Sequence, residues 1–271
     1  MKKKKLLNKL ITIVSIMIVV AWLFPILYMI LSSFKFESQV AIPSLTFTPT
    51  LENYKAVVDE EFYLHLLNSL IVTGGSVLIS GILGVAGAYA IVHSRLKNPN
   101  GIYFWFLTTT FLPAVSVIAP VYLTFAKTFL LDTKIALILL NIGMGVPLMI
   151  WMCTTYFKEI PVEIIEAATI DGSSRWNTFF KIMLPLIKNG IISSSLLVFI
   201  ITWNEFFFAI TITATESATL PVYMSKFMTQ TGYFWGKMSA AGTMVVLIPV
   251  IIGFFTQKAL VKGLTLGSVK G

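Results

Sequence analysis

Residues 159–188 read EIPVEIIEAATIDGSSRWNTFFKIMLPLIK, a polar and amphipathic interruption between two strongly apolar stretches. Pro161 suits the first turn of a helix, because its missing N–H is not needed there. Four residues then recur at spacings that place them on one helical face: Ile164, Ile165, Ala168 and Thr169. Gly172 predicts the end of this helix, because glycine enters the left-handed backbone region without a Cβ clash.

A second helix is predicted to follow at once. Ser173 or Ser174 can cap its N-terminus, and Pro185 interrupts its pattern. Its apolar side carries four residues: Trp176, Phe179, Phe180 and Met183. A pair of short helices like this can also be an ordinary surface hairpin, so its role depends on the rest of the chain.

The composition indicates a membrane protein. Of the 271 residues, 56% are hydrophobic and 12% charged, whereas soluble domains carry roughly 25% charged residues, and the mean hydropathy is +0.86. The net charge of +8 lies in short basic clusters at the edges of apolar segments, which favours membrane topology and anionic lipid over nucleic acid. Cys153 has no disulfide partner, and His65 and His93 are too isolated for a metal site.

We predict six membrane-spanning helices over residues 10–31, 67–92, 102–125, 135–156, 190–213 and 239–255. The first span follows a cluster of lysines, and a basic start before an apolar segment is also typical of a secretory signal. Its apolar run of about 22 residues is longer than a signal core and sufficient to cross roughly 30 Å of hydrocarbon, so we take it as an uncleaved span.

Charge distribution predicts the orientation of these spans. Fourteen of the 20 lysine and arginine residues lie in the N-terminus, the segments 93–101 and 157–189, and the tail 256–271. By the positive-inside rule, both termini and the hairpin 159–188 are cytoplasmic. The segment 32–66 should face outward, with extended structure followed by a short helix from Leu51.

Small residues and prolines within the spans predict how the bundle packs. The second span contains five glycines that would allow close helix approach: Gly74, Gly75, Gly81, Gly84 and Gly87. The third span contains Pro113 and Pro120, which predict a kink in the bundle interior.

Candidate pathway residues are few. Glu205 is the one carboxylate placed within a predicted span, where a charge costs at least about 2.5–3.5 kcal/mol. It is either a proton site or substrate contact, or a residue near the outer interface that stabilises the bundle. Asn141 and Asn204 are divided in the same way between helix–helix hydrogen bonding and substrate contact. The sequence has no catalytic constellation, no metal-ligand cluster and no Walker A motif.

The hairpin carries a motif written EAA-x3-G-x9-I-x-LP. It is met by Glu166, Ala167, Ala168, Gly172, Ile182, Leu184 and Pro185. This resembles the signature of permease subunits of binding-protein-dependent ABC importers. The segments PTLENY, WNEFFFA, TLPV and KGLTLGSVKG extend the likeness along the chain. They are similar to the second permease subunit of carbohydrate importers, the MalG-like group.

The resemblance implies a coupling helix that docks in a cleft on an ATP-hydrolysing subunit. The expected partners are a homologous second permease, two ATP-binding subunits that carry ATP and Mg²⁺, and an extracytoplasmic solute-binding protein. This chain itself is expected to be no enzyme and to bind no cofactor. The apolar face of Ile164, Ile165 and Ala168 is expected to dock, while Glu166 and Asp171 meet basic groups and Gly172 sets the angle between the helices.

The predicted fold is therefore an all-α integral membrane protein, with six transmembrane helices in a single domain over residues 1–271. A cytoplasmic coupling helix lies between the fourth and fifth spans. The predicted function is import of a sugar, oligosaccharide or polyol across a bacterial cytoplasmic membrane. The alternatives are an ion-coupled carrier that uses Glu205, and an ABC importer for a non-sugar substrate. A Gly172→Asp change is predicted to uncouple ATP hydrolysis from transport or to prevent docking.

Overall fold

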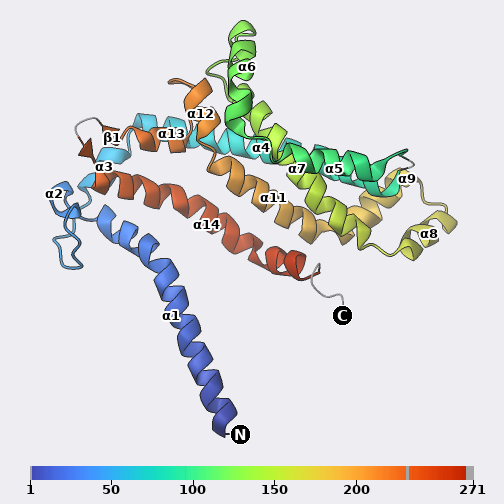
Figure 1. The fold of residues 1–271 in the computed structure, drawn as a ribbon, viewed down its shortest axis with the longest axis horizontal. Coiled ribbons are helices and arrows are strands. Elements are labelled where there is room, and N and C mark those ends of the chain that lie inside the picture. The colour runs from blue at the N-terminus through green and yellow to red at the C-terminus, as the bar shows by residue number, and fades with distance from the viewer. Residues whose placement is uncertain (1, 95, 230–231, 267–271) are drawn as a thin grey trace. The chain divides into compact units, whose positions relative to one another are not determined.

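The structure is a computed structural model that describes residues 2–94, 96–229 and 232–266 (Figure 1). The chain divides into two compact units, residues 1–63 with 224–248 and residues 64–223 with 249–271. The last five residues of the predicted tail, 267–271, lie outside the described residues.

Four helices are long and apolar enough to cross a membrane: α1 (Lys2–Ser33), α4 (Glu60–His93), α7 (Lys134–Lys158) and α14 (Trp235–Leu266). They contain the predicted first, second, fourth and sixth spans and extend beyond each of them. On α1 the large apolar side chains from Leu7 to Leu27 are exposed, Trp22 by 81%. Such a surface is suited to lipid or to apolar partners rather than to water, so the chain is a multi-pass membrane protein.

The predicted third span is not one kinked helix. It is divided into α5 (Pro99–Thr109) and α6 (Ala114–Lys127), which are bent by 87°. Pro113 lies at the break with extended backbone angles of −64° and 128°. Proline disfavours helical backbone at the preceding residue, so Leu112 closes the turn and a new helix begins. Within the described residues, four helices are thus long and apolar enough to be spans, or up to six if each bent pair is one span.

The predicted fifth span is also interrupted. α11 (Lys188–Trp203) ends before Asn204, and a short helix, α12 (Phe207–Ile212), follows. At its other end α11 is preceded by Arg175–Leu186 at an angle of 72°, with Ile187 at the bend. The segment 190–213 is thus a helix, a break and a helical turn rather than one rod.

In the first unit, the connection after α1 contains α2 (Glu37–Val40) and α3 (Glu52–Val57), and the expected short helix from Leu51 is confirmed. Asn53 ties this connection together, because its side-chain amide donates to the carbonyl oxygens of Ser33 at 3.0 Å and Lys35 at 2.7 Å. A two-residue antiparallel pair of strands, β1 (Met228–Thr229) and β2 (Gly232–Tyr233), is a small departure from the all-helical prediction.

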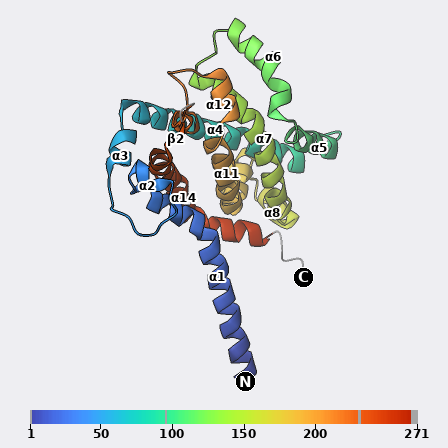
Figure 2. The same cartoon turned by 60° about the vertical axis from the view of Figure 1, so that its left-hand side comes forward.

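In the second unit, α7 packs against α5 and α11, and α12 packs against α6 and α7 (Figures 1 and 2). The larger apolar core joins nine buried residues: Val85, Ala88, Met149, Cys153, Tyr156, Phe157, Met183, Ile187 and Val198. A Cβ on Gly84 would lie 2.2 Å from the Cβ of Met149, so glycine is what permits this close approach of α4 to α7. By contrast, Gly74 and Gly81 have nothing within 4 Å of a built Cβ.

Candidate coupling site and pathway residues

The helix of the EAA motif is α8 (Val162–Ile170), which begins directly after Pro161, so this proline is the N-cap rather than a residue of the first turn as predicted. Its C-terminus is closed by a Schellman motif. The N–H of Ser173 donates to the carbonyl of Ala168 at 2.9 Å, and the N–H of Gly172 donates to that of Thr169 at 3.1 Å. Gly172 has a φ of +76°, the left-handed backbone that glycine adopts without strain. The predicted helix end is therefore confirmed at Gly172.

The exposed face of α8 is acidic and partly apolar. Five of its exposed residues recur at helical spacing or follow directly at the helix end: Glu163, Glu166, Ala167, Ile170 and Asp171. Ile170 is 86% exposed although its side chain is strongly apolar. Neither Ala167 nor Ile170 belongs to the apolar core that the bundle forms with the hairpin.

The orientation of α8 differs from the expectation that Ile164, Ile165 and Ala168 form the docking face. Ala168 is only 5% exposed, and Ile164 and Ile165 are half-buried. Ile165 packs against the larger core of its own bundle. The apolar stripe therefore serves to attach α8 to the bundle, and the acidic stripe points away from it.

The second half of the hairpin consists of α9 (Arg175–Asn177), a π-helical turn η1 (Thr178–Met183) and α10 (Leu184–Leu186). Ser174 caps α9, since its hydroxyl oxygen accepts the N–H of Asn177 at 3.3 Å. A π-helical turn is uncommon and is often found at functional positions.

The aromatic residues of this segment face two ways. Phe179 points inward and meets Tyr89 of α4 edge to face, with 4.7 Å between ring centroids. Trp176 is 74% exposed and stacks on Phe180 at 5.9 Å. Phe179 thus rests against its own bundle, whereas Trp176 is available to a partner or ligand.

Ile182, Leu184 and Pro185 continue the motif toward α11. Ile182 and Leu184 are half-buried, and Leu184 packs against the larger core. Pro185 is exposed within α10, two residues before the bend at Ile187. The hairpin is therefore connected to α11 through a packed but sharply bent joint.

Glu205 caps α12. Its carboxylate oxygens accept the N–H groups of Phe208 at 2.7 Å and Ala209 at 3.1 Å. A carboxylate at this place satisfies two of the donors that every helix N-terminus leaves unpaired. This geometry gives Glu205 a structural role in the break after α11.

The two asparagines are in different surroundings. Asn204 is exposed, and its side-chain amide donates to the carbonyl of Ile200 at 2.7 Å. Asn141 is only 2% exposed, and its Oδ1 has no hydrogen-bond partner in the described part of the chain. Asn141 is thus the pathway candidate with an unused polar atom in the bundle interior.

The sequence analysis missed a line of buried hydroxyls on α4. Ser69, Thr73, Ser76 and Ser80 recur with spacings of three or four residues and are at most 2% exposed. Ser69 accepts the N–H of Leu220 at 2.8 Å, whereas the hydroxyls of Ser76 and Ser80 have no partner among the described residues. Their helical spacing within an apolar segment was the available signal.

Asp132 is a second residue that sequence reasoning missed. Its carboxylate accepts the N–H groups of four consecutive residues at 3.0–3.3 Å: Ala214, Thr215, Glu216 and Ser217. Partial burial alone would raise the pKa of Asp132, but these four donors outweigh it and lower the pKa below its usual value. Asp132 therefore joins the connection before α7 to the connection after α12.

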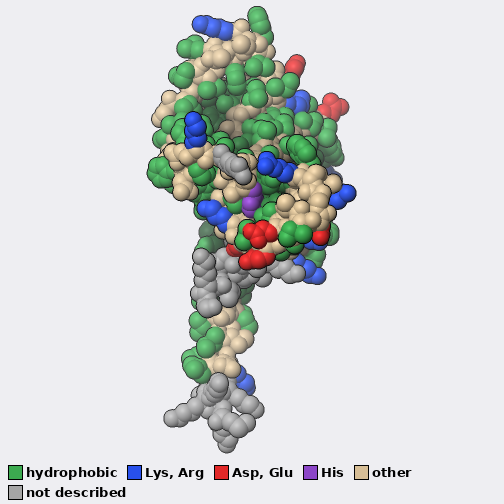
Figure 3. All heavy atoms as spheres, turned by 90° about the vertical axis from the view of Figure 1, so that its right-hand side faces the viewer, with side chains coloured by type: hydrophobic (Ala, Val, Ile, Leu, Met, Phe, Trp, Pro, Cys, Tyr) green, Lys and Arg blue, Asp and Glu red, His purple; other side chains and the backbone are tan. Residues whose placement is uncertain are grey.

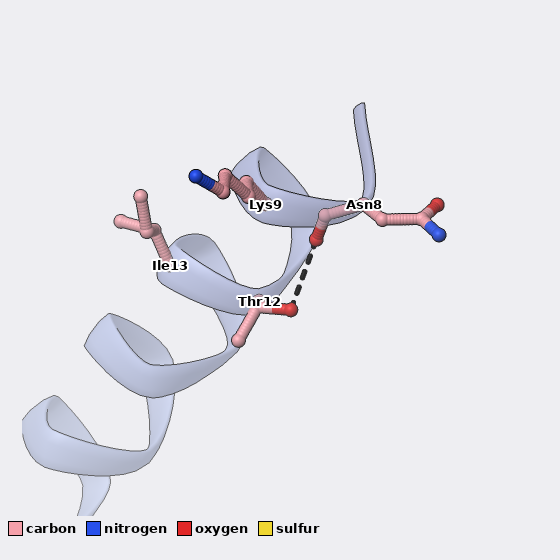
Figure 4. Close-up of a pocket in the computed structure, with 4 residues that line it drawn as sticks. All are labelled: Asn8, Lys9, Thr12 and Ile13. Atoms are coloured by element: carbon pink, nitrogen blue, oxygen red, sulfur yellow. Dashed lines mark hydrogen bonds between the residues drawn. The ribbon is translucent and has the colours of Figure 1, made fainter. Parts of the chain in front are cut away.

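Two further features bear on where a ligand or a metal ion could bind. The hollow beside Asn8, Lys9, Thr12 and Ile13 lies along the single helix α1, and its Thr12 hydroxyl is bonded back to the Asn8 carbonyl at 2.9 Å (Figure 4). Among the described residues, no three histidine, cysteine, aspartate or glutamate side chains are grouped closely enough to hold a metal ion.

The chain is similar to known transport proteins over almost its full length. It is 32% identical over 277 residues to the trehalose/maltose transport system permease protein MalG of Thermococcus litoralis, covering 100% of both chains. It is also 32% identical over 257 residues to the trehalose transport system permease protein SugB of Mycobacterium tuberculosis, covering 92% of this chain and 93% of that one.

The fold is similar to that of a solved transporter structure. A chain from the crystal structure of a bacterial ABC transporter involved in the import of alginate superposes with a TM-score of 0.75 and 23% identity, covering 95% of this chain and 97% of that one. The family described as binding-protein-dependent transport system inner membrane component matches residues 1–266. This chain therefore belongs to the family of binding-protein-dependent transport system inner membrane components.

Proposed function

We propose that this chain is the permease subunit of an ATP-driven importer and forms half of the translocation pathway for a sugar, oligosaccharide or polyol. The two relatives that match over 92% and 100% of this chain are named as permeases for trehalose or for trehalose and maltose. The transporter with the similar fold is named for import of the polysaccharide alginate. Carbohydrate is the substrate class that these names share.

In this proposal α5 with α6 completes the third span and α11 with α12 completes the fifth, which gives six spans with both termini and the hairpin 159–188 in the cytoplasm. The excess of lysine and arginine at the termini and around the hairpin supports this orientation. The protein is then placed in a bacterial cytoplasmic membrane, and the exposed apolar surface of α1 lies against lipid or the second, homologous permease.

The observation that carries the proposal is the exposed acidic face of α8 at the position of the EAA motif. Glu166, Ala167 and Asp171 are exposed on it, and Gly172 ends the helix with a closed set of hydrogen bonds. A helix held in this way can dock on an ATP-binding subunit and move as one body with it. On the inner side, α8 and η1 are attached to the bundle by Ala168, Ile182 and Leu184. Pro185 helps to place the bend at Ile187 before α11.

The remaining partners follow from this assignment. Two ATP-binding subunits carry ATP and Mg²⁺, and a solute-binding protein delivers the substrate from outside. In the pathway, Asn141 is the substrate contact, because its unpaired Oδ1 is the polar atom that a sugar hydroxyl can satisfy. Asn204 and Glu205 shape the break between α11 and α12.

The test is uptake of labelled sugar by vesicles containing the assembled complex and its solute-binding protein. ATP enclosed with the ATP-binding subunits is expected to drive accumulation, and removing those subunits is expected to abolish it. Accumulation driven by a proton gradient without any ATP-binding subunit would contradict the proposal and would favour an ion-coupled carrier. ATP-driven uptake of a peptide but of no carbohydrate would contradict the substrate class alone.

A further inference from the structure

A cavity of about 610 Å³ lies between the cytoplasm-facing end of α4 and the coupling hairpin. Its volume is within the range of about 300–1,000 Å³ that small-molecule sites occupy. The α4 end, α8 and the α9–η1 segment all contribute to its wall. Six of the lining residues carry its chemistry: Tyr89, His93, Thr169, Ser173, Arg175 and Trp176.

The wall presents polar groups that the chain itself does not satisfy. His93 Nε2 is inaccessible to solvent and has no hydrogen-bond partner in the described part of the chain. Arg175 lines the same cavity and makes no ion pair with any described residue. A buried polar atom without a partner is costly, and a guanidinium is the side chain best shaped for a phosphate. The pair points to an oxyanion ligand.

Residues with hydroxyl groups also line the cavity. The single proton of the Thr178 hydroxyl is shared between Ser173 Oγ at 3.2 Å and the Ser174 carbonyl at 3.1 Å, which leaves the Ser173 proton available to another acceptor. The Thr169 hydroxyl donates to the Ile165 carbonyl at 2.8 Å and can still accept a hydrogen bond. A ligand that both donates and accepts hydrogen bonds, as a polyhydroxylated ring does, fits this arrangement.

Aromatic rings form the remaining wall. Tyr89 and Phe179 meet edge to face at 4.7 Å, and Trp176 is largely exposed at the cavity rim. Aromatic faces cover the apolar side of a planar or ring-shaped ligand at little entropic cost. Figure 3 faces the side that carries α8 and α9 and shows a histidine side chain at the surface with basic and acidic side chains nearby.

We infer that this cavity is a regulatory site for a sugar phosphate on the cytoplasmic side. The phosphate binds Arg175 and His93, and the sugar ring lies between the hydroxyls and the aromatic side chains. The inference rests on the proposed function in two respects: that the hairpin lies on the cytoplasmic side of the membrane, and that α8 couples transport to ATP hydrolysis.

A ligand at this place contacts both α4 and the hairpin, so it stabilises one position of α8 relative to the bundle. Because coupling needs α8 to move with the ATP-binding subunit, a bound sugar phosphate slows transport. The supply of phosphorylated sugar inside the cell then limits further import. A kinase acting on the imported sugar is the class of reaction that produces such a ligand.

The direct test is equilibrium binding of radiolabelled glucose 6-phosphate to the complete, detergent-solubilised importer without ATP. Saturable binding with a dissociation constant at or below about 1 mM is expected. The Arg175→Gln variant is expected to weaken it by about tenfold or more, since a charge-assisted hydrogen bond is lost. Lys181→Gln is the matched control, because Lys181 is an exposed cation of the same segment that does not line the cavity.

Competition identifies the ligand class. Unlabelled glucose 6-phosphate is expected to displace the label, whereas glucose, inorganic phosphate, adenosine monophosphate and phosphatidylglycerol vesicles at the same concentration are not. Displacement by inorganic phosphate, the nucleotide or the lipid as effectively as by the sugar phosphate would overturn the assignment. Absence of saturable binding, or equal binding by the Arg175→Gln and Lys181→Gln variants, would also overturn it.

A functional arm separates this inference from the proposed function. In vesicles that accumulate sugar with ATP, glucose 6-phosphate on the side of the ATP-binding subunits is expected to lower the uptake rate, each variant being compared with its own uninhibited rate. Unaltered uptake would contradict the inference and leave the importer assignment intact. Failure of all ATP-driven uptake would instead contradict the proposed function, while the binding measurement still decides on the cavity.

Discussion

Gly172 combines two properties that no other residue of the hairpin shares. Its φ of +76° requires a left-handed backbone, and nothing lies within 4 Å of a built Cβ, so the cost of a side chain there comes from the backbone rather than from a clash. Asparagine and aspartate tolerate this region better than other side chains do. These two residues differ in charge at nearly equal size, so they separate the role of charge from that of backbone angle.

We therefore expect Gly172→Asp to lower the ratio of sugar transported to ATP hydrolysed, because it adds a second negative charge beside Asp171 at the docking face. Gly172→Asn should keep a ratio close to that of the unchanged protein. The measurement is uptake and ATP hydrolysis in the same vesicles. Equal ratios for both variants would show that charge at this position has no part in coupling.

Asp132 gives a prediction about stability and pH. The Asp132→Asn change keeps one acceptor oxygen, so two of the four backbone N–H groups lose their acceptor and the other two bonds lose their charge assistance. It is expected to lower the free energy of unfolding by about 1 kcal/mol. Because the folded pKa lies below the usual value of about 3.9, this stabilisation is complete above that value and is lost as the pH falls through the folded pKa.

The check is thermal unfolding of both proteins in detergent from about pH 3 to pH 8, a range that includes the usual aspartate pKa. The difference in midpoint should be constant from about pH 5 upward and should shrink below about pH 4. Glu60→Gln, at an exposed carboxylate, serves as the control and should show no such loss. A difference that grows on acidification would contradict the assigned role of Asp132.

Among the elements, α4 and α7 are held at a distance that depends on one small residue. Gly84→Ala would place a methyl group 2.2 Å from the Cβ of Met149, so α7 must shift, and we expect a loss of about 1–3 kcal/mol in stability. Gly81→Ala, one turn away with open space, should be neutral or stabilising. Unfolding midpoints in detergent compare the two. Similar midpoints would mean that the helices do not approach as closely as the structure has them.

Local chemistry was enough to predict where α8 ends and where α9 begins. The end of the second helix was predicted wrongly at Pro185, because this proline lies within α10 and the bend comes at Ile187. Pro161, Gly172 and Ser174 act through their own backbone or side-chain hydrogen bonds, so their effects are visible in the sequence. The break at Pro113 was less predictable. A proline inside an apolar segment either kinks or ends a helix, and the outcome depends on which groups take up the freed carbonyls.

The direction in which α8 faces could not be read from spacing alone. The stripe of Ile164, Ile165 and Ala168 is real, but a helical period places residues together on a face without saying what that face meets. The bundle offers Ile165 an apolar core, so the apolar stripe turns inward. Likewise Glu205, expected inside a span, lies at a helix break, where its carboxylate has backbone N–H partners.

Across the whole molecule, apolar side chains remain exposed along α1 and on the hairpin at Ile170 and Trp176. The hairpin also carries exposed acidic side chains. A monomer in water would not leave so much apolar area exposed. In the proposed importer, lipid and the second permease cover the apolar surface of the long helices. The mixed acidic and apolar face of α8 is instead the surface proposed to meet a basic, partly apolar cleft on the ATP-binding subunit.

Two adjacent alanines test that proposal. Ala167 is exposed and Ala168 is buried, so cysteines at these positions differ in direction while sharing the same helix and size. The native Cys153 is buried in the bundle core and leaves the background low. In the assembled importer, a short thiol-reactive cross-linker is expected to join Ala167→Cys to the ATP-binding subunit and to leave Ala168→Cys unlinked. An assembled complex in which Ala167→Cys remains open to a bulky maleimide and forms no cross-link would contradict the coupling role of α8.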